Sequence, residues 1–297
     1  MKRKIKSISA YRIDLPPEGK HEDYRDKQGA DYLSAKYDDF GNLLEEIKFD
    51  DNGEVTGKSV YTYNKNGQLT GEETYNEFND LEENLSYDRD ENGRVEKEYI
   101  HYLDETKDTI IYEYNEDGKL FHKTLKDEDG EIEREDKIEY NGEFVVGEEV
   151  IEEGETVKKS QFKLDEKGKV TEAEMMNEDE DYRLVNEYDE NGNRVKSLKY
   201  NSEDQLIAKQ EFSYDDQNRM TEIVEEDPHK KNTTVIEYDE KGNATTQKEL
   251  NRNGIINHEL ERDYDEDGNI TEVRAFLTGQ GQAMARKYLL VYEYEFY

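Results

Sequence analysis

The acidic stretch Asp88-Arg89-Asp90-Glu91-Asn92-Gly93 has the spacing in this sequence that comes nearest to a metal site. Its side-chain oxygens at positions one, three and five, with glycine at six, match the first half of an EF-hand calcium loop. Position twelve of such a loop is a glutamate that binds calcium with both oxygens, whereas here it is Tyr99. The sequence therefore predicts an acidic turn rather than a metal site, with Asp88, Asp90 and Asn92 as the candidate ligands should an ion bind.

Other reactive side chains form no constellation typical of catalysis. The histidines are scattered, without an i,i+4 pair: His21, His101, His122, His229 and His258. There is no cysteine, which excludes a thiol nucleophile, a disulfide and a cysteine-based zinc site. Because 77 residues are Asp or Glu, close carboxylate pairs are unavoidable and indicate no glycosidase-like chemistry. We expect no catalytic residue, no cofactor and no enzymatic activity.

The acidic turn is one copy of a repeat. YDENGNRV (188–195) has near-copies that begin at Tyr37, Tyr63, Tyr114, Tyr238 and Tyr264. With Tyr87, Tyr140, Leu164 and Tyr214 included, neighbouring anchors lie 24 to 27 residues apart, and weaker copies fall about midway. The spacing predicts a strand and turn of about 12 residues, paired into hairpins of about 25.

The repeated motif carries the chemistry of a β-turn. A type I turn favours Asp or Asn at its first position and Gly at its fourth, where the backbone becomes left-handed. The clearest pairs of structural turn residues are Asp38 and Gly41, Asp189 and Gly192, Asp239 and Gly242, and Asp265 and Gly268. Asn79 and Asn218 stand where glycine is missing, and asparagine tolerates a positive φ better than most residues.

Between the turns, polarity alternates with a period of two. Residues two before the anchors are mostly apolar, whereas those immediately before them are polar, as in an antiparallel sheet with one buried and one wet face. An open sheet of about twenty strands exceeds the usual limit of about ten. We expect an all-β antiparallel β-hairpin array, a meander of about twenty strands, curled into a spiral or partial shell.

The chain is expected to have three parts. Residues 1–30 hold an N-terminal strand (Ile5 to Leu15) and a proline-containing cap, residues 31–276 the array, and residues 277–297 an aromatic C-terminal capping strand. Within the array, residues 98–113 form a hairpin whose turn lacks glycine.

Charge limits the classes of partner. The formal net charge of −36 repels nucleic acid and anionic membranes, and it favours a basic protein. The sequence has neither a signal-peptide core nor a membrane-span-length apolar run, so we expect a cytoplasmic protein; export without a signal peptide stays open. The aromatic face or the C-terminal strand could also join copies into an oligomer.

The motif Tyr-Asp-x-x-Gly-Asn/Arg-Leu/Val resembles the YD repeats of RHS proteins, and the resemblance extends from about Tyr37 to Phe276. The resemblance implies long β-sheets that spiral into hollow shells, which in bacterial members can enclose a toxic C-terminal domain. This chain is shorter than a full shell requires, and we expect no toxin domain after residue 276. A second resemblance, to MORN-like repeat proteins, implies a link to toxin neutralisation.

Three functions remain. We expect a non-catalytic scaffold or protein-interaction module that binds a basic or toxin-like protein. One alternative is an acidic nucleic-acid mimic that inhibits a DNA- or RNA-binding protein, although lysine alternates with glutamate on the wet face. The other is a hollow carrier for a small cargo.

Overall fold

The computed structural model describes residues 3–16, 29–177, 179–278 and 285–297. These residues form 22 β-strands and no helix, and so no helix that could cross a membrane. The strands are β1 (Ile5–Leu15), β2 (Ala30–Tyr37), β3 (Leu43–Phe49), β4 (Val55–Tyr63), β5 (Leu69–Asn76), β6 (Leu81–Arg89), β7 (Val95–His101), β8 (Lys107–Tyr114), β9 (Leu120–Lys126), β10 (Ile132–Asn141), β11 (Phe144–Glu152), β12 (Glu155–Leu164), β13 (Val170–Asn177), β14 (Tyr182–Tyr188), β15 (Arg194–Asn201), β16 (Leu206–Tyr214), β17 (Met220–Glu226), β18 (Lys231–Tyr238), β19 (Ala244–Asn251), β20 (Ile256–Tyr264), β21 (Ile270–Leu277) and β22 (Arg286–Phe296).

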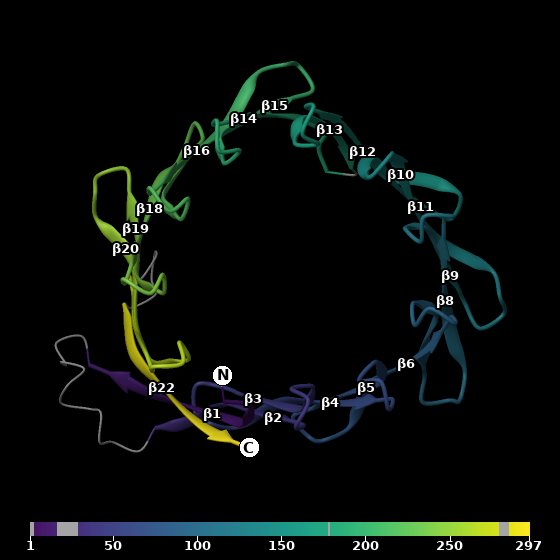
Figure 1. Ribbon diagram of the computed structural model, residues 1–297, viewed down its shortest axis with the longest axis horizontal. Helices are drawn as coiled ribbons and strands as arrows, with labels where there is room; N and C mark the ends of the chain where they lie inside the picture. Colours follow the sequence, from purple (N-terminus) through teal and green to yellow (C-terminus); the bar gives the residue numbers. More distant parts are fainter. Residues whose placement is uncertain (1–2, 17–28, 178, 279–284) are drawn as a thin grey trace. The chain divides into compact units, whose positions relative to one another are not determined.

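The strands group into two compact units. Unit 1 comprises Met1–Asn84 and Asn232–Tyr297, and unit 2 comprises Leu85–Lys231. Within each unit, strands adjacent in sequence are antiparallel neighbours, as the colour order in Figure 1 lets the reader follow. This arrangement confirms the predicted all-β antiparallel hairpin array. The predicted terminal segments 1–30 and 277–297 both belong to unit 1; Pro17 and residues 279–284 lie outside the described residues.

The first and last strands of the array pair with each other, so the expected spiral or partial shell is wrong. Strand β1 pairs with β2 on one side and with β22 on the other, and β22 also pairs with β21. In Figure 1 the yellow β22 accordingly lies beside the purple β1. Pairing satisfies backbone groups that a free edge strand would leave exposed. Both edges of β22 are taken, so an oligomer contact at this strand would have to use side chains.

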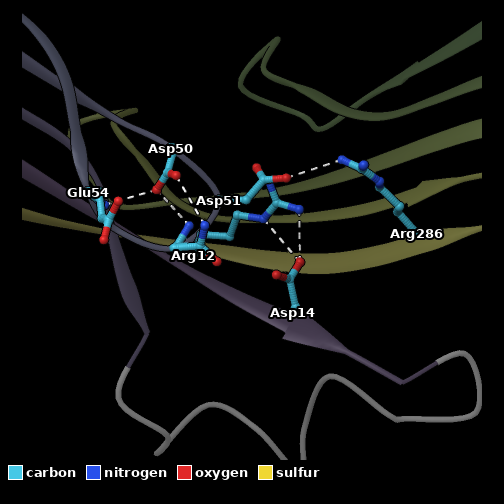
Figure 2. A network of polar contacts seen from close by, with 7 residues as sticks. Arg12, Asp14, Asp50, Asp51, Glu54 and Arg286 are labelled. Atoms are coloured by element: carbon cyan, nitrogen blue, oxygen red, sulfur yellow. Dashed lines mark hydrogen bonds and ion pairs between the residues drawn. The ribbon is translucent and has the colours of Figure 1, made fainter. Parts of the chain in front are cut away.

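A polar cluster reinforces this junction in unit 1. Arg12, in β1, is only 8% exposed, and its guanidinium donates to the carboxylates of Asp14 and Asp51. Arg286, at the start of β22, donates to the other oxygen of Asp51 at 3.2 Å. Figure 2 shows the two arginines on either side of Asp51. The turn after β3 is thereby tied to both terminal strands.

The turns of the YD-type repeat combine a tight loop with a bulge. In the copy at 188–195, Asp189 N–H donates to Asn193 O (2.9 Å) and Gly192 N–H donates to Asp189 O (3.0 Å). Gly192 has φ of 86°, which makes this a three-residue loop of type I with a left-handed closing residue. Tyr188 pairs with Arg194 but Glu187 pairs with Lys196, so Val195 is the extra residue of a β-bulge.

Burial follows the predicted alternation only in part. Residues immediately before the anchors, such as Lys36, Glu113 and Glu187, are exposed. Those two before the anchors are mostly half-buried, and among them Ala35 and Phe212 are buried. The described residues of each unit supply no helix to cover the aromatic face, which explains why it stays half-open. The apolar core lies in unit 1, where Ile13, Leu15 and Leu289 pack together.

Candidate binding surface

The predicted turn residues act inside the turns. Asp239 shows the pattern: one carboxylate oxygen accepts the N–H groups of Lys241 (2.9 Å) and Asn243 (2.8 Å), and the other accepts Asn243 Nδ2 (2.8 Å). The side-chain and backbone hydrogen bonds from Asn243 lower the pKa of Asp239. Asp38, Asp189 and Asp265 likewise accept the backbone N–H and Nδ2 of Asn42, Asn193 and Asn269. The glycines of the four turns, Gly41, Gly192, Gly242 and Gly268, have φ of 95°, 86°, 91° and 80°.

The residue after the left-handed turn position, which is Gly in most turns and Asn218 in one, is a second structural position. It is asparagine in the four turns above, whereas Arg94 and Arg219 occupy it elsewhere and donate Nε to Asp90 and Asp215 at 2.7 Å. Both residue types place a donor against the outer carboxylate oxygen. The alternation of Asn and Arg in the repeat motif was the sequence signal for this position.

The anchor tyrosines make a hydrogen bond that sequence reasoning missed. In six anchor tyrosines, and in Tyr294 of β22, the phenolic O–H donates to the carbonyl of the residue two past the glycine of an upstream turn, at 2.7–2.9 Å. The pairs are Tyr63–Leu43, Tyr114–Val95, Tyr140–Leu120, Tyr188–Val170, Tyr214–Arg194, Tyr264–Ala244 and Tyr294–Ile270. The preference for Tyr over Phe at the anchors was the available signal. These bonds link successive turns on one sheet edge.

Two of the three candidate calcium ligands, Asp88 and Asp90, accept hydrogen bonds from protein donors. Asp90 accepts the N–H groups of Asn92 and Arg94 (both 2.9 Å) on one oxygen, and Arg94 Nε on the other. Asp88 accepts the hydroxyl of Tyr99 at 2.8 Å. In the described parts of the chain, no three Asp, Glu, His or Cys side chains are placed to hold one ion. The local arrangement is that of an ordinary repeat turn.

One Ser–His contact has the distance of a nucleophile and its base. Ser86 Oγ lies 2.7 Å from His101 Nε2. Nucleophilic catalysis also needs a group that orients the imidazole and donors that bind the oxyanion. No carboxylate contact with His101 is seen among the described residues, so this pair gives no triad.

A shallow groove crosses unit 2. It consists of two adjoining pockets of about 320 and 420 Å³ that share Lys159 and Gln161. The first is crossed by two rows of directly opposed residues: Glu139, Gly147 and Gln161 in one, and His122, Lys137, Glu149 and Lys159 in the other. Opposed residues in antiparallel strands share a face. The strand register therefore places these side chains, which come from the four strands β9 to β12, next to one another on one face.

Gly147 lies in the middle of its row. A Cβ built at this position would approach Glu139 Oε2 to 3.2 Å and Ser160 O to 3.4 Å. The missing side chain leaves room for the Glu139 carboxylate to lie across strand β11. The Ser160 hydroxyl is buried and has no hydrogen-bond partner in the described residues, but Ser160 alternates with Gln161 and so faces away from this row.

Ion pairs hold several groove side chains in place. His122 lies between two carboxylates, with Nδ1 2.7 Å from Glu113 and Nε2 2.9 Å from Glu135. Lys159 Nζ lies 3.4 Å from Glu149. A hydrogen bond from Thr156, followed by the charge of Lys159, lowers the pKa of Glu149 despite partial desolvation. The groove is thus a fixed array of charges suited to binding a polar chain.

The charge of the groove is negative. Its two pockets are lined by five carboxylates, from Glu139, Glu149, Glu174, Asp181 and Asp204, and by three cations, from Lys137, Lys159 and Arg183; Glu148 lies opposite Ser160 and faces away with it. Apolar surface from Phe121 and Met176 adjoins these charges. This combination favours a ligand that carries both positive charge and apolar groups.

The fold and this surface define an antiparallel β-hairpin repeat protein with a charged groove. No protein-family profile matches the sequence, and no curated protein sequence matches it. Among solved structures, a porin-like protein from Bacteroides uniformis aligns over 99% of both chains, with 9% identity and a TM-score of 0.37. TcdB2-TccC3 without its hypervariable C-terminal region aligns with 97% of this chain, at 12% identity and a TM-score of 0.43. This chain spans 17% of that one, and neither likeness carries an argument about function.

Proposed function

We propose that this chain is a non-catalytic protein-interaction module of the β-hairpin repeat type, which binds an extended basic segment of another protein. The observation that carries the proposal is the groove of unit 2, whose five carboxylates exceed its three cations. The net charge of −36 adds long-range attraction for the same class of partner. We also propose that the chain is a member of the YD-repeat family, on the basis of its turn motif. A cytoplasmic location is part of the proposal too, on the basis of composition.

A nucleic-acid mimic is the less favoured function because many wet-face carboxylates already have a cationic neighbour. Cross-strand pairs such as Lys36–Glu45 (2.7 Å), Lys163–Glu172 (2.5 Å) and Lys248–Glu259 (3.0 Å) interrupt any continuous row of negative charge. A phosphate backbone carries no such neutral intervals.

The test is affinity capture with the full chain, its groove variant and a charge-matched control. The groove variant carries Glu139→Gln and Glu174→Gln; the control carries Glu187→Gln and Glu237→Gln, two exposed residues outside the groove lining. We expect the full chain and the control to retain the same basic protein at low salt, and the groove variant to retain much less. Binding should weaken as salt rises.

Two results would count against the proposal. One is equal recovery of the basic protein by the groove variant and the control, which would show that the groove does not bind it. The other is capture of nucleic-acid-binding proteins that DNA competitively releases, which would favour the mimic.

A further inference from the structure

The turn between β7 and β8 departs from the rule that the other turns obey. Every other three-residue loop of this kind in the described residues begins with Asp or Asn and has Gly, Asn or Asp at the left-handed position. This loop begins with Tyr102 and places Glu105 at the left-handed position, with φ of 72°. The left-handed conformation costs an ordinary L-residue about 1–2 kcal/mol. This tip thus lacks both the capping residue at its first position and the favoured residue at its left-handed position, and Asp104 within the loop accepts the Thr106 N–H at 3.2 Å instead.

The same tip exposes apolar side chains. Leu103 is 84% exposed, the highest value among the large apolar residues that are described, and Tyr102 is 46% exposed. Ile132, at the start of β10, is 55% exposed. A hydrogen bond to Asp108, together with partial burial, raises the pKa of Tyr102 to about 12, and Glu133 and Glu128 contribute to this rise. Because β7, β8, β9 and β10 pair in antiparallel order, the turn between β9 and β10 lies on the same sheet edge as the turn that holds Tyr102.

Negative charge surrounds these side chains. Residues 102–108 carry three carboxylates and residues 126–133 carry five, which makes eight against the two lysines Lys107 and Lys126. Lys107 is directed toward the ring of Tyr99, at 3.8 Å from the centroid. The exposed apolar tip therefore lies in a field that repels nucleic acid, anionic membranes and a second copy of this acidic chain.

We propose that Tyr102, Leu103 and Ile132 form a docking tip for an amphipathic segment of a partner protein, in which an apolar side chain is flanked by Lys or Arg. Leu103 supplies the apolar anchor and the eight carboxylates bind the flanking cations. This inference rests on the proposed function for the class of partner, but it concerns a surface separate from the groove, since no tip residue lines either pocket.

The departure from the turn rule supports this assignment. Asn at position 102 would cap the loop, and a polar residue at 103 would cost nothing in packing, since Leu103 is almost fully exposed. A residue choice that forgoes stability at an exposed tip is expected where the tip binds something.

The experiment measures binding of two labelled peptides to the full chain by fluorescence anisotropy at physiological salt. The peptides have equal length and equal charge, one alternating Lys with Leu and the other alternating Lys with Ser. The tip variant carries Tyr102→Asn and Leu103→Ser, which leaves the net charge unchanged. Phe40→Ser is the matched control, because Phe40 is 81% exposed at the tip of a turn that obeys the rule.

We expect the Lys-Leu peptide to bind the full chain and the Phe40→Ser variant at least about tenfold more tightly than it binds the tip variant. The Lys-Ser peptide should bind all three proteins alike and weakly. Thermal unfolding of the tip variant should match or exceed that of the full chain, because a capping residue is restored.

Equal binding of the Lys-Leu peptide to the tip variant and the full chain would overturn the docking tip. So would equal binding of the two peptides to the full chain, which would leave only diffuse charge attraction. Neither outcome would bear on the proposed binding at the groove, because the capture experiment tests that binding separately through Glu139 and Glu174.

Discussion

The tyrosine-to-carbonyl bonds between turns should contribute measurably to the stability of unit 2. Tyr140→Phe and Tyr188→Phe each remove one hydroxyl and keep the ring. A net hydrogen bond of this kind is worth about 0.5–1.5 kcal/mol. The acceptor of Tyr188, Val170 O, also accepts Asn186 Nδ2 at 2.9 Å, whereas Leu120 O has Tyr140 as its one side-chain donor among the described residues.

Because only one of the two carbonyls keeps a side-chain donor, the two substitutions should lower the unfolding free energy by different amounts. After Tyr188→Phe the carbonyl of Val170 remains hydrogen-bonded, so we expect a loss of about 0.5 kcal/mol. After Tyr140→Phe the carbonyl of Leu120 loses its side-chain donor at a half-buried position, so we expect about 1–1.5 kcal/mol. The two sites share no partner, and the double variant should show the sum.

Urea unfolding followed by far-UV circular dichroism measures both losses, with hydrogen exchange in β9 and β13 to assign them to unit 2. The dependence of the unfolding free energy on urea should stay unchanged, since no surface area is lost. The reasoning fails if Tyr140→Phe is as stable as the full chain, or if Tyr188→Phe loses more than Tyr140→Phe.

Three further predictions concern a turn, the core and pH. Gly192→Ala should cost about 1–2 kcal/mol in urea unfolding because Gly192 has φ of 86°; an unchanged midpoint would contradict the turn assignment. Leu289→Ala should cost about 2–5 kcal/mol, since Leu289 is 0% exposed beside Ile13 and Leu15, and a loss well below 2 kcal/mol would show that this core collapses around the deletion. Thermal stability should fall at both ends of the pH range. Hydrogen bonds lower the pKa of Asp239 below 3.8. Its contribution to the free energy of unfolding is therefore complete above about pH 4 and is lost as pH falls through the pKa of the folded state. Burial raises the pKa of Tyr188 above 10.0. Its contribution to the free energy of unfolding is therefore complete below about pH 10 and is lost as pH rises through the pKa of the folded state. Melting temperatures across the pH range, with tyrosinate absorbance on the alkaline side, would refute this account if the profile were flat.

The all-β antiparallel character of the chain could be predicted because its causes are local. A turn such as Asp189 to Gly192 depends on one capping side chain and one residue that tolerates a positive φ, both within four positions. The alternation of polarity along a strand likewise needs only the next residues in sequence. Neither requires knowledge of distant partners.

Only the tertiary structure decided which distant strands meet and which side chains share a face. The pairing of Ile5–Leu15 with Arg286–Phe296 joins opposite ends of the chain, and no local pattern specifies it. The groove residues come from separate strands that strand register aligns, and a slip of one residue would send Glu139 and Gln161 to the other face. The exposed tip at Leu103 could be located in the sequence as a glycine-free turn, but its neighbouring carboxylates on β10 became visible only once β8, β9 and β10 were paired.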